Sequence, residues 1–351
     1  MHAQFQTRLR TITSYGRRAG SARVRVFDWL DWLGLEATSD TYLDGSSNSP
    51  GVLARNPQGL IAAELRLRRT ARSVGDDTVL LSRQASPFSN GVIEARLLYN
   101  SARGIYDFDD SLMFSAGGRL DSLWSKSRVW TRAVVAADVV IAGNAFLANE
   151  ASPHSRNVVV IPSCVNPDDY PGKKKYEIGA APRAVWLGSP STEPYLRLVA
   201  NPLLVLHRSS GLRLTVISAG AADLGVLEPM VDRVPWSPST YARDLAAADF
   251  GIMPLDDTPW TRGKCAYKLL QYGATGLPMI GSPVGANTDV LQRSDGLLAS
   301  SSDDWVAAME SLVQESPERR ARRGATSLTA VTEGYSFAAW ESKWRSALNL
   351  R

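Results

Sequence analysis

Two lysines and a glutamine in the last third of the chain have the spacing of a phosphate-binding helix. Lys264, Lys268 and Gln271 lie four and three residues apart, so on a helix they share one face. Thr261 is a candidate N-cap for this helix, and Arg262 falls in its first turn. Cations at the positive end of a helix dipole disfavour the helix, and a bound anion reverses that cost. The spacing therefore predicts a diphosphate site at the start of the helix, with a solvated basic face as the alternative.

Three carboxylates lie close together in the first half of the chain, at Asp107, Asp109 and Asp110. They follow the apolar segment 104–106, which is expected to be a strand. Such a cluster could coordinate Mg²⁺, activate an acceptor hydroxyl, or serve only in capping and structural salt bridges. The residues alone leave these alternatives open. Further along, Trp236 follows a strand-like segment, where it either stacks on a nucleobase or packs beneath Pro238.

Cysteine and histidine are scarce, which disfavours several kinds of site. The two cysteines, Cys164 and Cys265, are too few for a disulfide framework or a structural zinc site. The three histidines disfavour a histidine-based metal site, and no Ser-His-Asp or Cys-His signature stands out. We therefore expect no metal site and a reducing, cytoplasmic compartment.

Positive charge is concentrated at the start of the chain. The 351 residues carry 39 basic and 35 acidic side chains, a net charge of +4. The first 25 residues hold no acid and the arginines Arg8, Arg10, Arg17, Arg18, Arg23 and Arg25, so the remainder is close to neutral. This distribution disfavours a general nucleic-acid binder. It predicts a disordered basic arm over residues 1–20, with weak peripheral contact to anionic lipid as the alternative.

Apolar runs and helical patterns alternate along the chain, as in α/β proteins with mostly parallel sheets. In the first half the expected strands are Val24–Phe27, Thr78–Ser82, Gly104–Tyr106, Val139–Ala142 and Val158–Ile161, and the expected helices are Leu60–Val74, Val92–Ser101 and Arg128–Ala137. The segment Pro167–Pro182 then has the proline, glycine and lysine content of a linker between domains. No stretch is long and apolar enough to cross a membrane, and Asp28 and Asp31 interrupt Val24–Leu35, so we expect no signal peptide.

The alternating pattern restarts after the linker. The expected strands are Ala184–Leu187, Leu212–Ser218, Val231–Pro235, Phe250–Met253 and Met279–Gly281, and the expected helices are Tyr195–Arg208, Thr240–Ala248, Arg262–Tyr272, Asp303–Glu315 and Phe337–Leu348. Two successive α/β halves in a chain of this length predict two Rossmann-like domains facing across a cleft. Ligands are expected at the carboxyl ends of the parallel strands.

The segment Ala248–Gly285 carries the most specific motif. It contains Asp249-Phe250-Gly251-Ile252-Met253-Pro254-Leu255, Trp260, Arg262–Tyr272, Gly276-Leu277-Pro278 and Ser282-Pro283-Val284-Gly285. With this motif the chain resembles retaining glycosyltransferases of the GT-B fold, specifically the family 4 group. The resemblance covers most of Gly104–Gly296, and supporting stretches are Tyr106–Asp110, Val158–Val165 and Trp186–Ser189. The ending Tyr335–Trp344 is similar to the terminal helix with which that family crosses back to the N-terminal domain.

The resemblance implies a division of the chain by substrate. After the arm, residues 21–168 are expected to form the acceptor domain, 169–334 the nucleotide-sugar donor domain, and 335–351 the crossover helix. On the acceptor side the resemblance places Asp107, Asp109 and Asp110 on the wall of the cleft, with Asp109 as the catalytic candidate and the other two as substrate-binding candidates. On the donor side it places Trp236 beside the nucleobase.

One departure from the family pattern concerns its two glutamates, which fall on Gly263 and Gln271 when the motifs are aligned. Gln271 can still hydrogen-bond a ribose hydroxyl, whereas Gly263 cannot replace a carboxylate. Asp256 or Asp257, in the preceding loop, is the candidate to supply the missing acid.

A second departure concerns the basic residues that the family carries after the first strands of the donor domain. Gly188 and Ser189 follow the first of these strands instead, and they are expected to contact the donor. Diphosphate binding then shifts to backbone N–H groups with Arg262, Lys264 and Lys268, and we take Arg262 and Lys268 as catalytic candidates.

These features predict a metal-independent, hexosyltransferase-type glycosyltransferase that needs no cofactor besides its donor. The donor is expected to be a UDP-, GDP- or dTDP-sugar, transferred with retention to a hydroxyl or amine of a small-molecule or lipid-linked acceptor. Natural-product and cell-envelope glycan synthesis are both open. The alternatives are a non-catalytic sugar-nucleotide-binding partner, favoured by the missing glutamates, and a sugar-nucleotide epimerase on the same fold.

Overall fold

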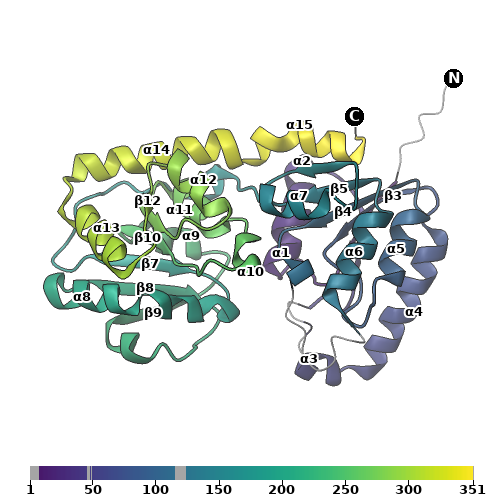
Figure 1. The fold of residues 1–351 in the computed structure, drawn as a ribbon, viewed down its shortest axis with the longest axis horizontal. Helices are drawn as coiled ribbons and strands as arrows, with labels where there is room; N and C mark the ends of the chain where they lie inside the picture. The colour runs from purple at the N-terminus through teal and green to yellow at the C-terminus, as the bar shows by residue number, and fades with distance from the viewer. Residues whose placement is uncertain (1–7, 46–47, 49, 115–123, 351) are drawn as a thin grey trace. The chain divides into compact units, whose positions relative to one another are not determined.

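The computed structural model describes residues 8–45, 48, 50–114 and 124–350, which form two compact units (Figure 1). Unit 1 comprises the chain up to Ser163 together with Gly263–Cys265 and the segment from Trp340. Unit 2 comprises Cys164–Arg262 and Ala266–Ala339. The chain therefore leaves unit 1 after Ser163, a few residues before the boundary expected at residue 168. It returns to unit 1 briefly at Gly263–Cys265 and finally within the last helix.

Unit 1 is built on a six-stranded parallel sheet with the strand order β2-β1-β3-β4-β5-β6. The strands are β1 (Arg8–Thr13), β2 (Thr38–Thr41), β3 (Asp77–Ser82), β4 (Arg103–Phe108), β5 (Val139–Ala142) and β6 (Val158–Val160). The helices are α1 (Gly20–Ala22), α2 (Asp28–Leu33), α3 (Pro50–Ala54), α4 (Pro57–Ser73), α5 (Val92–Tyr99), α6 (Lys126–Ala136) and α7 (Ala145–Ala151), with a π-turn at Arg23–Phe27 and a 3₁₀ turn at Leu112–Phe114. Every residue of β3 is buried, as expected for a central strand covered by helices on both faces.

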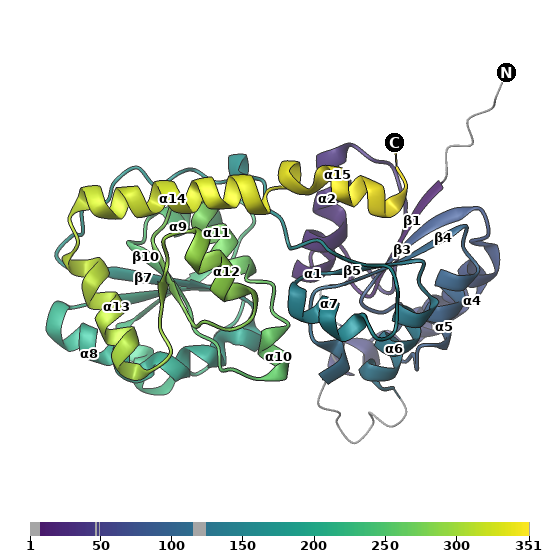
Figure 2. The ribbon, with the colours of Figure 1, turned by 45° about the horizontal axis from the view of Figure 1, so that its top comes forward.

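Unit 2 is a second six-stranded parallel sheet, with the order β12-β11-β10-β7-β8-β9. Its strands are β7 (Arg183–Leu187), β8 (Arg213–Ser218), β9 (Val231–Pro235), β10 (Phe250–Met253), β11 (Met279–Gly281) and β12 (Leu297–Leu298). Its helices are α8 (Ala200–Ser210), α9 (Tyr241–Ala246), α10 (Pro259–Arg262), α11 (Tyr267–Thr275), α12 (Ala286–Arg293), α13 (Ser302–Gln314) and α14 (Pro317–Tyr335), with 3₁₀ turns at Pro167–Asp169, Pro190–Val199 and Gly225–Met230. Helices lie on both sides of this sheet (Figure 2). Separate apolar clusters fill the two sides.

The strand order of unit 2 contains a topological switch point. Read from β9, the sheet runs third, second, first, fourth, fifth and sixth strand of the unit, so the direction of winding reverses between β7 and β10. In doubly wound sheets the helices leave such a pair of strands toward opposite faces, so a crevice is expected at the carboxyl ends of β7 and β10. This crevice is where doubly wound sheets bind their ligands. Leu187 and Met253 end the two strands, and Gly188 and Pro254 follow them.

The last helix, α15 (Phe337–Leu348), begins in unit 2 and ends in unit 1. In unit 2 the backbones of Tyr335 and Phe337 hydrogen-bond that of Val165, at 3.0 and 3.3 Å. In unit 1 the indole of Trp344 stacks on that of Trp29, with ring centroids 5.1 Å apart. Both indoles are buried, so this pair anchors the end of the chain in the core of unit 1.

Most of the expected elements are confirmed, but the start of the chain is not as expected. The arm predicted for residues 1–20 is wrong from Arg8 onward, because Arg8–Thr13 forms β1, an interior strand between β2 and β3. Residues 1–7 of that prediction lie outside the described residues. Arg10 is held across the sheet by Asp77 and Asp40, at 2.6 and 2.7 Å. The charge of this segment favours an arm, whereas its alternation of charged and apolar residues is typical of a strand.

The strand predicted at Val24–Phe27 is also wrong, since this segment lies in a helical stretch that runs from Gly20 to Leu33. A short buried apolar run has the same pattern in a strand and in a buried helix, and the β-branched residues of this run favour a strand. The stretch ends at Gly34, whose backbone is left-handed with φ 59°. Sequence analysis also missed three strands, β1, β2 and β12, and four helices, α3, α7, α12 and α14. No helix among the described residues is long and apolar enough to span a bilayer.

The predicted linker Pro167–Pro182 is attached to unit 2. The backbone N–H of Lys173 donates to the carbonyl of Thr275 at 2.7 Å, and the Tyr176 hydroxyl donates to the carbonyl of Gly276 at 2.7 Å. The ammonium group of Lys173 donates to the carbonyl of Ala248 at 2.6 Å. Composition identified a segment without regular secondary structure, but these contacts are non-local and could not be read from it.

Candidate functional site

The helix expected at Arg262–Tyr272 is broken, and its functional half begins later than predicted. Arg262 ends the short α10, and α11 begins at Tyr267, after Ala266 in a left-handed conformation with φ 53°. A left-handed alanine is strained and interrupts any continuous helix. The predicted N-cap role of Thr261 is therefore wrong; its hydroxyl donates to the carbonyl of Asp256 at 2.5 Å within the α10 turn. Lys264 precedes α11, so it does not share a helix face with Lys268 and Gln271.

Lys268 lies at the switch point of unit 2. Its ammonium group is 5.2 Å from the ring centre of Trp186, a buried side chain of β7. A Cβ added to Gly188 would lie 2.8 Å from Cε of Lys268 and 2.4 Å from the Trp186 ring. Gly188 thus leaves room for the lysine at the carboxyl end of β7. The arrangement places a cation at the positive end of α11, in the crevice where an anionic ligand is expected.

We expect Gly188→Ala to weaken nucleotide binding about 10-fold, because the added methyl group displaces Lys268 or Trp186. Isothermal titration of the nucleoside diphosphate that binds best measures the effect. Gly172→Ala is the control, since a Cβ at Gly172 meets no atom within 4 Å. Equal affinities of the two variants would show that Gly188 is not part of the binding surface.

Arg262 and Asp256 lie in the loop after β10. Arg262 forms an ion pair with Asp257, with Nε 2.6 Å from Oδ1, and both side chains are about half exposed. The partner of Arg262 in the structure is therefore a neighbouring carboxylate, and an anionic ligand would have to compete with it. The side chain of Asp256 is exposed. The catalytic role of Arg262 and the donor-binding role of Asp256 remain predictions.

Gln271 and Trp236 belong to one aromatic cluster in unit 2. The Gln271 amide donates to the hydroxyl of Tyr170 at 3.3 Å, and the hydroxyl of Tyr241 donates to the same oxygen at 3.2 Å. The rings of Trp236 and Tyr241 are stacked, with centroids 6.0 Å apart. Gln271 is buried, so its contact with a ribose requires a rearrangement, whereas the half-buried Trp236 ring can offer an edge or face to a base.

Ser189 precedes the 3₁₀ turn that follows β7, and its hydroxyl lies 3.1 Å from that of Ser191. A carboxylate that sequence analysis missed lies in the same turn. Glu193 is fully buried, and it accepts hydrogen bonds from the backbone of Ala222 at 2.9 Å and from Arg233 at 3.1 Å. These bonds fix the loop after β8 against the turn after β7. No local motif distinguishes Glu193 from a surface glutamate, because its partners come from distant strands.

In unit 1 the predicted acidic cluster is held by arginines. Asp107, the fifth residue of β4, forms a fork-like ion pair with Arg25, with Nη2 of the arginine 2.5 Å from Oδ1. Both side chains are almost fully buried, and Arg25 also donates to the carbonyl of Ile161 at 2.9 Å. Burial opposes the charge of Arg25, but the Asp107 carboxylate outweighs it and raises the pKa of the guanidinium group. Asp107 is thus occupied by a structural contact, and its predicted substrate-binding role would require that contact to open.

Asp110 is shared by two cations of unit 1. Its oxygens lie 2.9 Å from Nη2 of Arg83 and 2.8 Å from Nζ of Lys264, a residue that groups with unit 1. Burial alone would raise the pKa of Asp110, but the charges of Arg83 and Lys264 lower it below its usual range. Lys264 is therefore paired with a carboxylate in this structure, and it does not join Lys268 on α11. Of the roles that the sequence left open for the three carboxylates, Asp107 and Asp110 have that of structural salt bridges in this structure.

Asp109 differs from its two neighbours. Its Oδ1 is buried with no hydrogen-bond partner among the described residues, and the nearest cation is Nη1 of Arg83 at 3.7 Å. An unsatisfied buried carboxylate oxygen is costly and is often retained for function. The thiol of Cys265 donates to the backbone carbonyl of Asp109. Burial and the Asp109 carboxylate raise the pKa of this thiol, so Cys265 is unsuited to act as a nucleophile.

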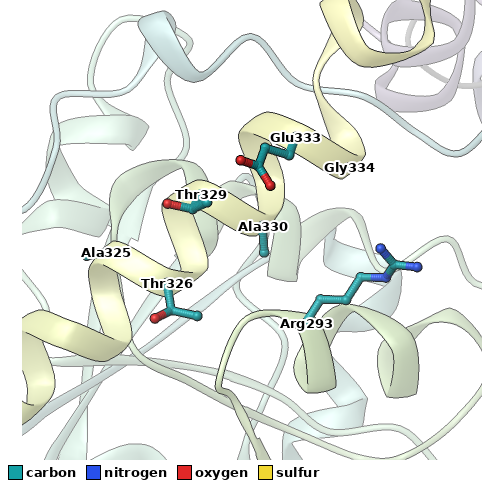
Figure 3. A pocket seen from close by; sticks show the side chains of 7 residues that line it. All are labelled: Arg293, Ala325, Thr326, Thr329, Ala330, Glu333 and Gly334. Atoms are coloured by element: carbon teal, nitrogen blue, oxygen red, sulfur yellow. The ribbon is translucent and has the colours of Figure 1, made fainter.

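The described residues contain no group of three or more His, Cys, Asp or Glu side chains that could hold a metal ion. A groove of about 640 Å³ lies elsewhere in unit 2, between α12 and α14 (Figure 3). Its lining consists of Arg293, Ala325, Thr326, Thr329, Ala330, Glu333 and Gly334. None of the predicted site residues lines it, and its shape alone assigns it no ligand.

No family model matches the sequence, and no curated protein matches it. Solved structures do match. HepE from Anabaena, in complex with UDP, superposes with a TM-score of 0.69 at 11% identity, over 98% of this chain and 100% of that one. Trehalose 6-phosphate synthase from Burkholderia multivorans gives 0.65 at 12% identity, over 98% and 96%.

TarM gives a TM-score of 0.60 at 12% identity and covers 81% of this chain; this chain spans only 57% of TarM. Likenesses at this level of identity show the fold alone. The chain has the GT-B fold. The expectation of two Rossmann-like domains is thereby confirmed, and the switch point of unit 2 is the place where a doubly wound sheet binds its ligands.

Proposed function

We propose that this protein transfers a sugar from a nucleoside-diphosphate sugar to a hydroxyl or amine acceptor. The observation that carries the proposal is Lys268, held beside Gly188 and Trp186 at the switch point of a doubly wound sheet. The GT-B fold supports it, as does the likeness to HepE, which was solved with UDP and with UDP and glucose. UDP is accordingly the first nucleotide to test, with GDP and dTDP next.

In the proposed mechanism the leaving diphosphate gains charge as the sugar departs. Lys268 and the positive end of α11 stabilise that charge without a metal ion. The sugar passes through an oxocarbenium-like state. With retention, which the resemblance to family 4 suggests, the acceptor attacks from the face that the diphosphate leaves, and the departing phosphate takes the acceptor proton.

On the acceptor side we assign Asp109 to positioning the acceptor hydroxyl or amine, whose proton goes to the departing phosphate. Its buried, unsatisfied oxygen distinguishes it from Asp107 and Asp110, which are occupied by arginine and lysine. The acceptor is either a small molecule or a lipid-linked sugar, in natural-product or envelope glycan synthesis. Both cysteines are free thiols, which favours a cytoplasmic location.

A panel of UDP, GDP, dTDP and ADP tests the donor site by thermal unfolding. We expect one nucleotide to raise the melting temperature, because a ligand at 100 times its dissociation constant stabilises the folded state by about 2.7 kcal/mol. Lys268→Ala should lose most of this shift. If no nucleotide changes the melting temperature, the cation on α11 is an ordinary solvated charge and the proposal is wrong.

Product analysis separates the proposal from its two alternatives. A non-catalytic binding partner would show the thermal shift but neither transfer to an acceptor nor hydrolysis of the donor. An epimerase would convert the donor sugar with no acceptor present. The absence of a glutamate at position 263 favours the non-catalytic binding partner over the epimerase. A Cβ at this position would lie 2.0 Å from Oγ of Ser111, so position 263 admits no side chain without rearrangement.

A further inference from the structure

The outward face of α4 in unit 1 combines exposed aliphatic side chains with arginines. Ile61, Leu65, Arg68 and Arg72 are spaced by four, three and four residues, so they form one stripe along the helix. Ile61 is 64% exposed and Leu65 is 46% exposed. The opposite face, which includes Ala63 and Leu67, is buried in the core of unit 1. The stripe therefore points away from the core.

Further groups of the same two kinds lie beside the stripe. Arg69 is exposed on α4, and Val52 is 41% exposed on α3, a helix that contacts α4 (Figure 1). Arg66 instead donates to the carbonyls of Thr41 and Tyr42, at 2.6 and 2.8 Å. Among the described residues, Arg68, Arg69 and Arg72 have no ion-pair partner. The single acid of the helix, Glu64, is turned inward and accepts a hydrogen bond from Tyr42 at 3.0 Å. The described face of α4 is thus basic and apolar at once, and the one acid of the helix is turned away from it.

We propose that this face of α4 docks on an anionic lipid surface. Guanidinium groups bind phosphate in a fork-like geometry, and each cation near an anionic membrane adds to the attraction. The aliphatic side chains enter the headgroup region, as in helices that lie in the membrane plane. A second copy of the chain is disfavoured, because two such arginine stripes would repel each other. A nucleic acid would use the arginines but gain nothing from Ile61 and Leu65.

This location replaces the basic arm that the sequence suggested. Arg8 and Arg10 belong to β1, and Arg25 is buried with Asp107, so these cations are part of the fold. Deletion of residues 1–20 would remove an interior strand and is not a clean test. Point variants on α4 change only side chains that lie on the surface.

Co-sedimentation of the full chain with vesicles tests the proposal. We expect binding to phosphatidylcholine vesicles that contain phosphatidylglycerol, weaker binding at high salt, and little binding to phosphatidylcholine alone. Arg68→Gln, Arg69→Gln and Arg72→Gln together should weaken binding about 100-fold, at roughly five-fold for each cation. Arg208→Gln, Arg319→Gln and Arg322→Gln, which remove three exposed arginines of unit 2, should leave binding unchanged.

An environment-sensitive dye on Ile61→Cys distinguishes insertion of the stripe from loose adsorption. We expect a blue shift with anionic vesicles, and none for the same dye on Val226→Cys, an equally exposed position in unit 2. The proposal is overturned if the wild-type chain stays in solution, if the unit 2 arginine variants lose as much binding, or if the chain sediments without a shift at position 61. None of these outcomes depends on whether the protein transfers sugar.

Discussion

Lys268→Ala lowers turnover about 100-fold or more if the lysine stabilises charge that develops on the leaving diphosphate. Removal of one preorganised group at a developing anion typically costs this much. The structure gives the reason for a large effect. Lys268 is confined by Trp186 and Gly188, so its ammonium group is held at the N-terminal end of α11 before the substrate arrives. Steady-state kinetics with the donor identified by the thermal panel measures the loss.

The control for this variant is Lys174→Ala, which removes an exposed lysine of unit 2 outside the site. Its turnover should equal that of the wild type. Lys268→Arg keeps the charge but needs more space beside Gly188, so we expect only partial recovery. A fall in kcat shows that the lysine acts on the transition state, whereas a rise in KM alone shows uniform binding. Wild-type kinetics in Lys268→Ala would contradict the proposed mechanism.

Much of the fold could be predicted from sequence because the signals were local. Apolar runs such as Val139–Ala142 and Phe250–Met253 are buried strands whose bounds agree with the structure. Their alternation with helices was enough to predict two parallel sheets. The strand β1 was missed although its sequence alternates, since Arg10 finds its partners, Asp40 and Asp77, only across the sheet on β2 and β3. Charge alone could not distinguish a solvated arm from an interior strand.

The candidate site was predicted less well, because its geometry depends on one backbone conformation. The spacing of Lys264, Lys268 and Gln271 favours one continuous helix, but the left-handed Ala266 separates the first of them from the other two. Few alanines adopt this conformation, so composition gives no warning. Lys268 and Gly188, which the sequence proposed separately as donor-site candidates, are neighbours in the structure. Their proximity follows from the strand order of unit 2, which no short motif encodes.

The Arg25–Asp107 pair shows the same limit from the side of electrostatics. Eighty-two positions separate the two residues, and sequence analysis placed Arg25 in a predicted strand, Val24–Phe27, and Asp107 among the acceptor-site candidates. In the structure each charge is buried and is compensated mainly by the other. Such a pair contributes little net stability relative to an apolar replacement, but loss of one partner leaves a charge in a dry environment.

Arg25→Met should therefore destabilise unit 1 by about 3–5 kcal/mol, because it strands the carboxylate of Asp107 in the core. Thermal unfolding followed by circular dichroism measures the loss. Arg17→Met is the matched control: Arg17 pairs with Asp31 at 2.6 Å, but both side chains are more than half exposed, so its loss should be about 1 kcal/mol or less. Equal melting temperatures for the two variants would show that loss of Arg25 does not leave a costly unpaired carboxylate at Asp107.

The pH dependence of Arg25→Met gives a second readout that simple loss of packing would not produce. Burial raises the pKa of Asp107, and removal of Arg25 takes away the main charge that opposes this rise. A carboxyl group with a raised pKa in the folded state binds protons more tightly there than in the unfolded chain, so it penalises folding at neutral pH and ceases to do so in acid. The stability deficit relative to wild type should shrink as the pH falls toward about 4, the ordinary aspartate value.

Asp107→Leu in the Arg25→Met background should restore part of the lost stability at neutral pH, because it removes the stranded charge itself. A deficit that is constant with pH and is not relieved by Asp107→Leu would mean that Arg25 stabilises unit 1 through its contact with Ile161 and its packing alone.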